Sequence, residues 1–249
     1  MRLYLASANP DKLREFREAA GAQGFLLEAV PGIEHLPPCV EDGLTFAENA
    51  RKKALHYSAC TDGLVLADDS GISVDALGGA PGVHSARFAG PVTDDGANNR
   101  KLLAELHRIE RVGEGPCGPP DSEPPVELPS PSRRNGQANT AGRTYMSAPA
   151  NRAAHYVCVI VLAREGKVLT TVEGRADGVI IDTPRGSGGF GYDPYFFFPP
   201  LGKTFAEITS AEKFAISHRG DAFRKLLDYL REAYPASGNC PSPPRPQQV

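Results

Sequence analysis

The spacing of apolar and polar positions predicts strands that alternate with helices through the first half of the chain. Residues 2–6 and 25–30 have the short apolar pattern of strands. A helix is expected between them, because Asn9 is a suitable N-cap and Pro10 occupies the first helical position, where its missing N–H costs nothing. A strand-to-helix turn is therefore predicted at residues 7–9.

A capping box marks the start of the next predicted helix. Thr45 and Glu48 have the T-x-x-E spacing in which each side chain accepts a hydrogen bond from the backbone N–H of the other residue. We expect a helix over 46–58, and the leucines within 98–106 predict another that faces the core.

The second half opens with a predicted hairpin. The apolar runs 154–163 and 167–178 read as strands joined by a turn at 165–166, and helices are expected over 210–216 and 218–233. Strands that alternate with helices and are followed by a hairpin indicate an α/β fold built on a mixed sheet.

Two segments lack this periodicity. Residues from about 111 to 151 are rich in Pro, Gly and Ser, so they offer little apolar surface to offset their ordering entropy. We interpret them as a disordered or loosely ordered insertion within one domain, 1–234, rather than as a linker between domains. The Pro-rich residues 235–249 are expected to form a disordered tail.

Charge and composition exclude some partners. The net charge of −3 disfavours nucleic acid or an anionic membrane surface as the main partner. Five cysteines without a C-x-x-C spacing disfavour a disulfide framework or a structural zinc site. The longest apolar run, 156–163, is shorter than the ~20 residues that span a bilayer. A soluble, cytoplasmic protein is expected.

The first candidate for chemistry is the predicted turn that carries Ser7, Asn9 and Lys12. Backbone N–H groups and the positive end of a helix dipole attract anions, and Lys12 would add a full charge against a phosphate. An ordinary capped helix with a solvated lysine is the alternative. The G-x-x-x-x-G-K-[ST] loop of P-loop enzymes is absent from the sequence.

An acidic pair is the second candidate. Asp68 and Asp69 follow the apolar run 64–67, which we expect to be a strand that ends there. Because neighbours on a strand point to opposite faces, one aspartate can enter a cleft while the other braces the backbone. Mg²⁺ prefers one or two carboxylates together with waters and phosphates, and Glu41 could supply the second. A solvated Asx-turn is the alternative.

A glycine-rich run is the third candidate. Residues 186–194 contain the letters G-x-G-x-x-G, but Pro194 and an aromatic run follow instead of the helix that a dinucleotide site requires. We therefore expect a flat ring to stack on Phe190, with Asp193 at its edge. A glycine-rich turn with core aromatics is the alternative.

The fourth candidate is the corner between the last two predicted helices, which carries Lys213, His218 and Arg219. Cations and an imidazole suit a phosphate or a carbonyl oxygen. A helix C-terminus with dipole-matched cations is the alternative reading.

Six motifs in order carry a resemblance to a known family. They read S-x-N-x-x-K, E-D-G-L-T-F-x-E-N-A-x-x-K-A, A-D-D-S-G, G-G-A-P-G-x-x-S-A-R, G-G-F-G-Y-D-P and E-K-x-x-I-S-H-R. Over residues 2–108 and 153–231 the chain resembles the inosine triphosphate pyrophosphatase family, which acts on deaminated purine nucleotides. The resemblance implies a two-lobed mixed sheet flanked by helices, a substrate cleft between the lobes, a homodimer, and hydrolysis of ITP, dITP or XTP to the monophosphate and pyrophosphate.

The resemblance also assigns roles to residues. It implies a Mg²⁺ site at Glu41 and Asp69, with Asp69 as the catalytic base. The positions that match the substrate contacts of the family are Ser7, Asn9, Lys12, Lys53, Ser70, Phe190, Gly191, Tyr192, Asp193, Lys213, His218 and Arg219.

The sequence departs from the family at His84, where an aromatic residue is more frequent, at Val40, and in the insertion. Two other functions stay open, a related pyrophosphatase for other modified nucleotides and a nucleotide binder without activity.

Overall fold

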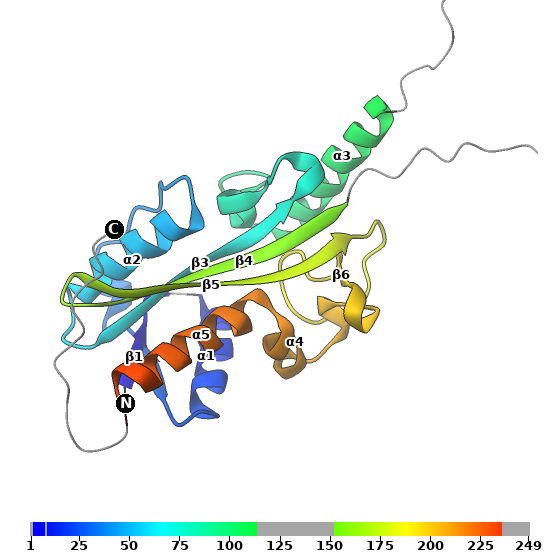
Figure 1. Ribbon diagram of the computed structural model, residues 1–249. Coiled ribbons are helices and arrows are strands. Elements are labelled where there is room, and N and C mark those ends of the chain that lie inside the picture. The colour runs from blue at the N-terminus through cyan, green and yellow to red at the C-terminus, as the bar shows by residue number, and fades with distance from the viewer. Residues whose placement is uncertain (1, 8, 114–151, 236–249) are drawn as a thin grey trace, which may run out of the picture.

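A seven-stranded mixed sheet forms the centre of the computed structural model, which describes residues 2–7, 9–113 and 152–235 (Figure 1). The strand order is β2-β1-β3-β4-β5-β6-β7. The first three strands in this order run parallel, and each later neighbour is antiparallel. The strands are β1 (Arg2–Leu5), β2 (Leu26–Ala29), β3 (Leu64–Val74), β4 (Ala153–Arg164), β5 (Lys167–Ile180), β6 (Phe196–Phe198) and β7 (Lys203–Thr204). The predicted mixed sheet is confirmed.

Five α-helices flank the sheet in the described part of the chain. They are α1 (Pro10–Gly21), α2 (Phe46–Ser58), α3 (Asp95–Gly113), α4 (Ser210–Ile216) and α5 (His218–Ala233). Helix α2 has the predicted bounds, and both halves of its capping box are formed. No helix within the described ranges has the length and apolarity to cross a bilayer.

The two faces of the sheet are covered by different helices. Leu64 and Leu66 of β3 pack with α1 and α5, whereas Val65 and Ala67 pack with α2 on the opposite face. This alternation is the two-residue period of a strand buried on both sides. In Figure 1, α2 lies on one side of β3–β5, and α1 and α5 lie on the other.

The long strands continue into a second lobe. Beyond the part covered by α1, α2 and α5, Ile72 and Val74 of β3 join a separate core that includes Leu102 of α3 and Phe196 of β6. Because β3, β4 and β5 pass through both cores, the two lobes share one sheet. The two-lobed fold implied by the resemblance is confirmed.

Two predicted boundaries are wrong. Strand β3 does not end at Ala67 but runs to Val74, because its ladder with β4 continues from Val65↔Ala163 to Val74↔Ala154. A long antiparallel partner therefore overrides the turn tendency of the D-D-S-G sequence. Helix α3 extends to Gly113, so the first residues of the expected insertion are helical. The rest of that insertion, and the tail beyond residue 235, lie outside the described residues.

Candidate active site

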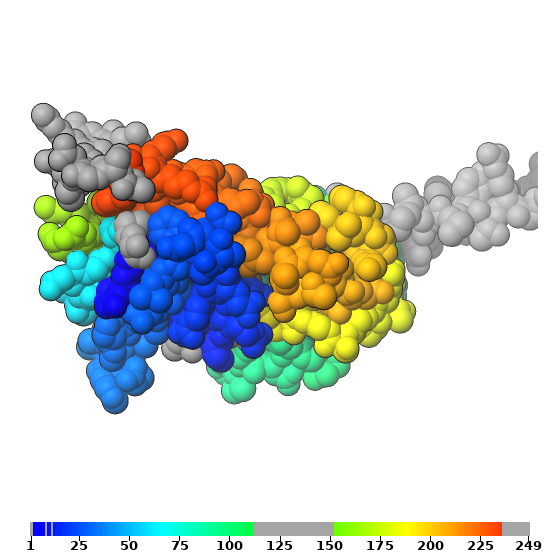
Figure 2. Space-filling model, turned by 90° about the horizontal axis from the view of Figure 1, so that it is seen from below, coloured from blue at the N-terminus to red at the C-terminus, as the bar shows by residue number. Residues whose placement is uncertain are grey.

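One cleft of about 610 Å³ brings the predicted site residues together. All of them line it: Ser7, Asn9, Lys12, Glu41, Lys53, Asp69, Ser70, Phe190, Gly191, Tyr192, Asp193, Lys213, His218 and Arg219. They come from the turn before α1 and its start, from the loop before α2, from α2 and β3, from the loop before β6 and from the α4–α5 corner. The N- and C-terminal parts of the chain that contribute to it lie side by side in Figure 2, in blue and orange.

The turn between β1 and α1 is built as predicted. Asn9 caps α1, since its Oδ1 accepts from the Lys12 backbone N–H at 3.1 Å, and Ser7 Oγ accepts from the Asn9 N–H at 3.2 Å. The Lys12 side chain is turned toward the sheet, where its Nζ pairs with Asp68 Oδ2 at 2.8 Å. The lysine is therefore positioned by an acid.

The two aspartates of β3 have different environments. Asp68 is buried on the α1 side and also accepts from the Ser70 hydroxyl at 3.3 Å. The expectation that this residue braces the backbone is wrong, because its carboxylate holds side chains. Asp69 points into the cleft, and its Oδ2 is buried without a hydrogen-bond partner among the described residues. Burial raises the pKa of Asp69 despite the opposing effect of Lys53 and Lys12.

Lys53 links the acidic pair to Glu41. This buried lysine of α2 donates to the Asp68 carbonyl oxygen at 3.0 Å and pairs with Glu41 Oε2 at 2.8 Å. Burial is the largest influence on its pKa and lowers it, but Asp68 and Glu41 together outweigh burial, so the pKa is raised. Lys53 therefore stays charged beside two carboxylates that face the cleft, those of Glu41 and Asp69.

These two carboxylates fit a magnesium ion. The described residues contain no cluster of three or more His, Cys, Asp or Glu side chains that could hold a metal. Mg²⁺ does not need such a cluster, because it binds one or two carboxylates and takes its other ligands from waters and phosphates. Asp69 Oδ2, which has no protein partner, and Glu41 on the same cleft are oxygen donors of that kind.

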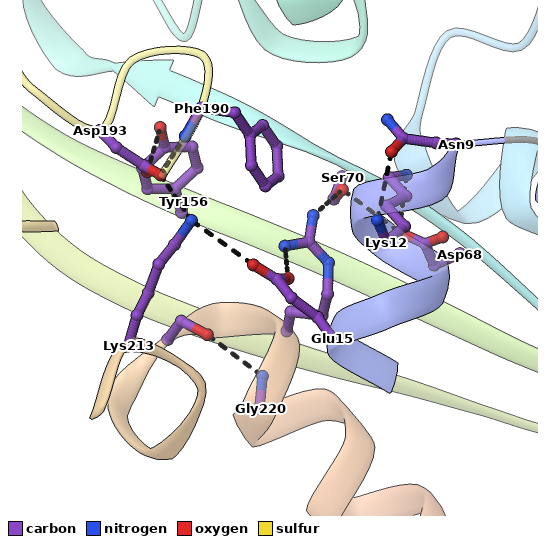
Figure 3. A network of polar contacts seen from close by, with 12 residues as sticks. Asn9, Lys12, Glu15, Asp68, Ser70, Tyr156, Phe190, Asp193, Lys213 and Gly220 are labelled. Carbon is purple, nitrogen blue, oxygen red and sulfur yellow. Dashed lines mark hydrogen bonds and ion pairs between the residues drawn. The ribbon is translucent and has the colours of Figure 1, made fainter. Parts of the chain in front are cut away.

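The opposite end of the cleft contains an aromatic platform. The Phe190 ring lies with Lys213 Nζ 4.4 Å from its centroid. Asp193 Oδ2 accepts from the Phe190 backbone N–H at 2.9 Å and from Lys213 Nζ at 2.5 Å, and the Tyr156 hydroxyl contacts Asp193 Oδ1 at 3.3 Å (Figure 3). The carboxylate of Asp193 is thus used to hold the loop and Lys213.

Arg219 lies between the two ends of the cleft. Its Nη1 pairs with Glu15 Oε2 at 2.7 Å, and its Nη2 donates to Ser70 Oγ at 3.3 Å. Glu15 is also 3.8 Å from Lys213 Nζ, and Figure 3 shows its carboxylate between Lys213 and Ser70. Arg219 Nε is buried and has no hydrogen-bond partner among the described residues.

His218 is held flat against a tyrosine. Its ring stacks on Tyr156 with centroids 4.6 Å apart and planes 8° apart. Burial, together with Arg219 and Lys213, lowers the pKa of His218 well below its ordinary value. The imidazole is therefore neutral, and its Nδ1 is buried without a hydrogen-bond partner in the described part of the chain.

Sequence reasoning missed several residues that line the cleft or contact its lining. Glu15 follows Lys12 by three positions, so helical spacing places both on one side of α1. Tyr156 lies within an apolar strand and looks like a core residue. Ser85 belongs to the S-A-R motif, and Asp95 begins α3; both line the cleft. His84, one of the departures from the family, is exposed and does not line it.

The cations that line the cleft are largely neutralised by carboxylates. The cations that line it are Lys12, Lys53, Arg87, Lys213 and Arg219. The carboxylates that line it or pair with these cations are Glu15, Glu41, Asp68, Asp69, Asp95 and Asp193. A polyanionic ligand would therefore need extra positive charge, which a divalent cation can bring.

Comparisons with known proteins agree with this arrangement. The model of the Ham1 family matches residues 3–114 and 131–229 and leaves residues 115–130 between them unmatched. A dITP/XTP pyrophosphatase of Acidobacterium capsulatum is 40% identical over 92% of this chain and 97% of its own length. One from Desulforamulus reducens is 39% identical over 94% of this chain and 98% of its own.

Solved structures give the same result. A HAM1 protein from Coxiella burnetii is 33% identical and superposes with a TM-score of 0.70, covering 94% of this chain and all of that one. The resemblance seen in the sequence motifs is thereby confirmed, and the chain belongs to the Ham1 family.

Proposed function

We propose that the chain is a pyrophosphatase that hydrolyses non-standard purine nucleoside triphosphates, ITP, dITP and XTP, to the monophosphate and pyrophosphate. The observation that carries the proposal is a single cleft with the capped turn of Asn9 and Lys12 at one end, an aromatic platform at the other, and the unpartnered oxygen of Asp69 between them. The relatives named dITP/XTP pyrophosphatase support the choice of substrate.

Magnesium is the proposed cofactor, with Glu41 and Asp69 as its protein ligands. The pairing of the cations favours it, because a triphosphate brings about four negative charges and Lys12 and Lys53 are already paired with Asp68 and Glu41. When bound, the ion would neutralise charge on the phosphates and on the pyrophosphate leaving group.

The residues of the chain have separate tasks in the proposed reaction. The N–H groups at the start of α1 and Lys12 hold the phosphates, and Lys53 adds a second positive charge. Asp69 assists the attacking water, either by taking its proton directly or as a ligand of the ion. Water then replaces pyrophosphate at the α-phosphorus.

Selection of the base is proposed for the platform and the α4–α5 corner. Hypoxanthine and xanthine carry a carbonyl oxygen at position 6, where adenine carries an amino group. Arg219 and Lys213 can only donate hydrogen bonds, and neutral His218 can donate from one nitrogen. Donors that face an amino group stay unpaired, so ATP should be a much poorer substrate, by on the order of 10⁴-fold in kcat/KM.

Product analysis tests the proposal. The chain should convert ITP and Mg²⁺ to IMP and pyrophosphate, resolved by ion-exchange chromatography. IDP and phosphate as first products would refute the reaction. Preference for a modified pyrimidine triphosphate or 7-methyl-GTP would favour the related pyrophosphatase, and ITP binding without turnover would favour the inactive binder.

A homodimer is proposed from the family resemblance, and light scattering on a size-exclusion column measures its mass. The cytoplasmic location stays a prediction, which cell fractionation tests.

A further inference from the structure

The backbone of Gly191, directly after the platform residue, is held at both of its peptide groups by the first residues of α3. Its N–H donates to Asp95 Oδ2 at 2.7 Å, and its carbonyl oxygen accepts from Asn99 Nδ2 at 2.9 Å. The same Asn99 amide donates to the Asp95 carbonyl oxygen at 2.8 Å, so the two side chains form one clamp. More than ninety residues separate the clamp from Gly191 in sequence.

The loop that carries Phe190 depends on such restraints. Gly189 and Gly191 flank the platform residue with φ of 69° and 64°, in the left-handed region that glycine enters at no steric cost. Two permissive residues leave the Phe190 backbone free to rotate unless something holds it. Within the loop, Asp193 Oδ2 accepts a hydrogen bond from the Phe190 N–H. The clamp on α3 lies outside the loop and fixes the peptide between Phe190 and Gly191.

The clamp itself has a rigid base. Asn99 is 6% exposed, and one helical turn further Leu102 is fully buried in the core of the second lobe. Asp95 lines the cleft, and Tyr192 of the loop donates its hydroxyl to the Ser85 carbonyl oxygen at 2.8 Å. The platform loop is therefore attached to the second lobe at successive residues, while Lys213 approaches Phe190 from α4.

We propose that Asp95 and Asn99 are positioning residues that hold Phe190 in place for the base and thereby set the affinity for the nucleoside part of the substrate. This inference rests on the proposed function, in which the base stacks on Phe190. It predicts that losing the clamp weakens nucleotide binding at the base and leaves binding at the phosphate turn unchanged.

Asp95→Ala and a neighbouring control separate this role from general damage to α3. Asp94 Oδ1 accepts from the Ala97 N–H at 2.9 Å, so Asp94→Ala removes the helix cap without touching Gly191. Asp95→Asn keeps an oxygen that can accept from the Gly191 N–H. Asp95→Ala should raise KM for ITP about three- to tenfold, the effect of losing one hydrogen bond, while Asp94→Ala and Asp95→Asn stay within about twofold of the parent chain.

A phosphate probe supplies the second readout. Tripolyphosphate has no base, so its inhibition constant against ITP hydrolysis should be the same in Asp95→Ala and in the parent. The positioning role would be overturned if Asp95→Ala raised the KM for ITP and the inhibition constant of tripolyphosphate equally. It would also be overturned if Asp94→Ala raised the KM as much as Asp95→Ala does. Asn99→Ala should act like Asp95→Ala, and the double variant should be less impaired than the product of the two effects, because both side chains hold Gly191.

Hydrogen exchange tests the clamp without turnover. Amides of 187–195 should exchange faster in Asp95→Ala than in Asp94→Ala or the parent, with 153–164 unchanged. Equal exchange in all three proteins would refute the clamp. If the exchange rates differ as expected but the parent chain releases no pyrophosphate from ITP, the proposed function is refuted and the clamp is still supported. If Asp95→Ala does not fold, Asn99→Ala is compared in the same two assays.

Discussion

Asp68 gives a stability effect that the structure predicts in size and in pH dependence. Burial, the largest single influence, raises the pKa of this carboxyl, but Lys12, Arg219 and Lys53 together outweigh it and lower the pKa from 3.8 to about 2. The ionised form of Asp68 is therefore more stable, relative to the protonated form, in the folded state than in the unfolded chain. A difference of nearly two pKa units corresponds to about 2 kcal/mol of stability at neutral pH.

The sign of the pH dependence follows from the lowered pKa. The stabilisation by Asp68 is complete at a pH well above 3.8, which is the pKa of this carboxyl in the unfolded chain. It is lost as the pH falls through about 2, the pKa of the same carboxyl in the folded state. Asp68→Asn should lower the free energy of unfolding by about 2 kcal/mol at pH 7, a loss of about 4–8 °C in Tm for a domain of this size. At pH 3 about half of that difference should remain.

Urea unfolding of the parent chain and Asp68→Asn between pH 3 and pH 7 measures the effect. Asp62→Asn is a matched control, since Asp62 is exposed just before the same strand and should change stability by less than about 0.5 kcal/mol at each pH. A loss for Asp68→Asn that is the same at pH 3 and pH 7 would show that shape, and not charge, causes it. A loss no larger than that of Asp62→Asn would refute the reasoning.

Three further changes have clear expectations. Asp69→Asn should reduce kcat for ITP by about 10²–10⁴-fold. It should not lower Tm, because burial already disfavours the charge of Asp69. Activity within tenfold of the parent would show that Asp69 does not take part in the reaction. Glu15→Gln removes the negative charge that faces buried Lys213 and Arg219, and it should lower the free energy of unfolding in urea by about 3 kcal/mol. The control Glu18→Gln, at an exposed position, should lower it by less than about 0.5 kcal/mol, and equal losses would contradict the ion-pair account. Replacing 115–130 by a short Gly/Ser linker should keep Tm and ITP turnover, because the family match passes over those residues; loss of folding would show that they are structural.

Local rules account for the elements that the sequence predicted well. Helix α2 was placed by its capping box, and the hairpin turn by Glu165 and Gly166, which have φ of 51° and 70°. Such signals depend on a few adjacent residues. The end of β3 was missed because the chain there has turn-forming residues, and only the partner strand β4, some 90 positions later, keeps it extended.

The site divides in the same way. Residues with a recognisable motif, such as Lys12, Asp69 and Phe190, could be selected from the sequence before their distances were known. Glu15 and Asn99 could not, because their roles come from contacts with residues about 200 and 90 positions away. Positional alternation separated Asp68 from Asp69, but only the structure shows that Asp68 holds Lys12.

The polar contacts join the two ends of the cleft into one network. From the platform, Lys213 contacts Glu15, Glu15 pairs with Arg219, Arg219 donates to Ser70, and Ser70 shares Asp68 with Lys12 at the start of α1 (Figure 3). Each member is buried or half-buried, so a shift of one must move its neighbours. In the proposed reaction, a base that displaces Lys213 or Arg219 therefore displaces Lys12 and the phosphates with it, whereas Phe190, which the α3 clamp holds, is not a member of this network. Small misplacements of reacting atoms are costly to the chemical step. Discrimination between purines should for that reason be expressed in kcat as well as in KM.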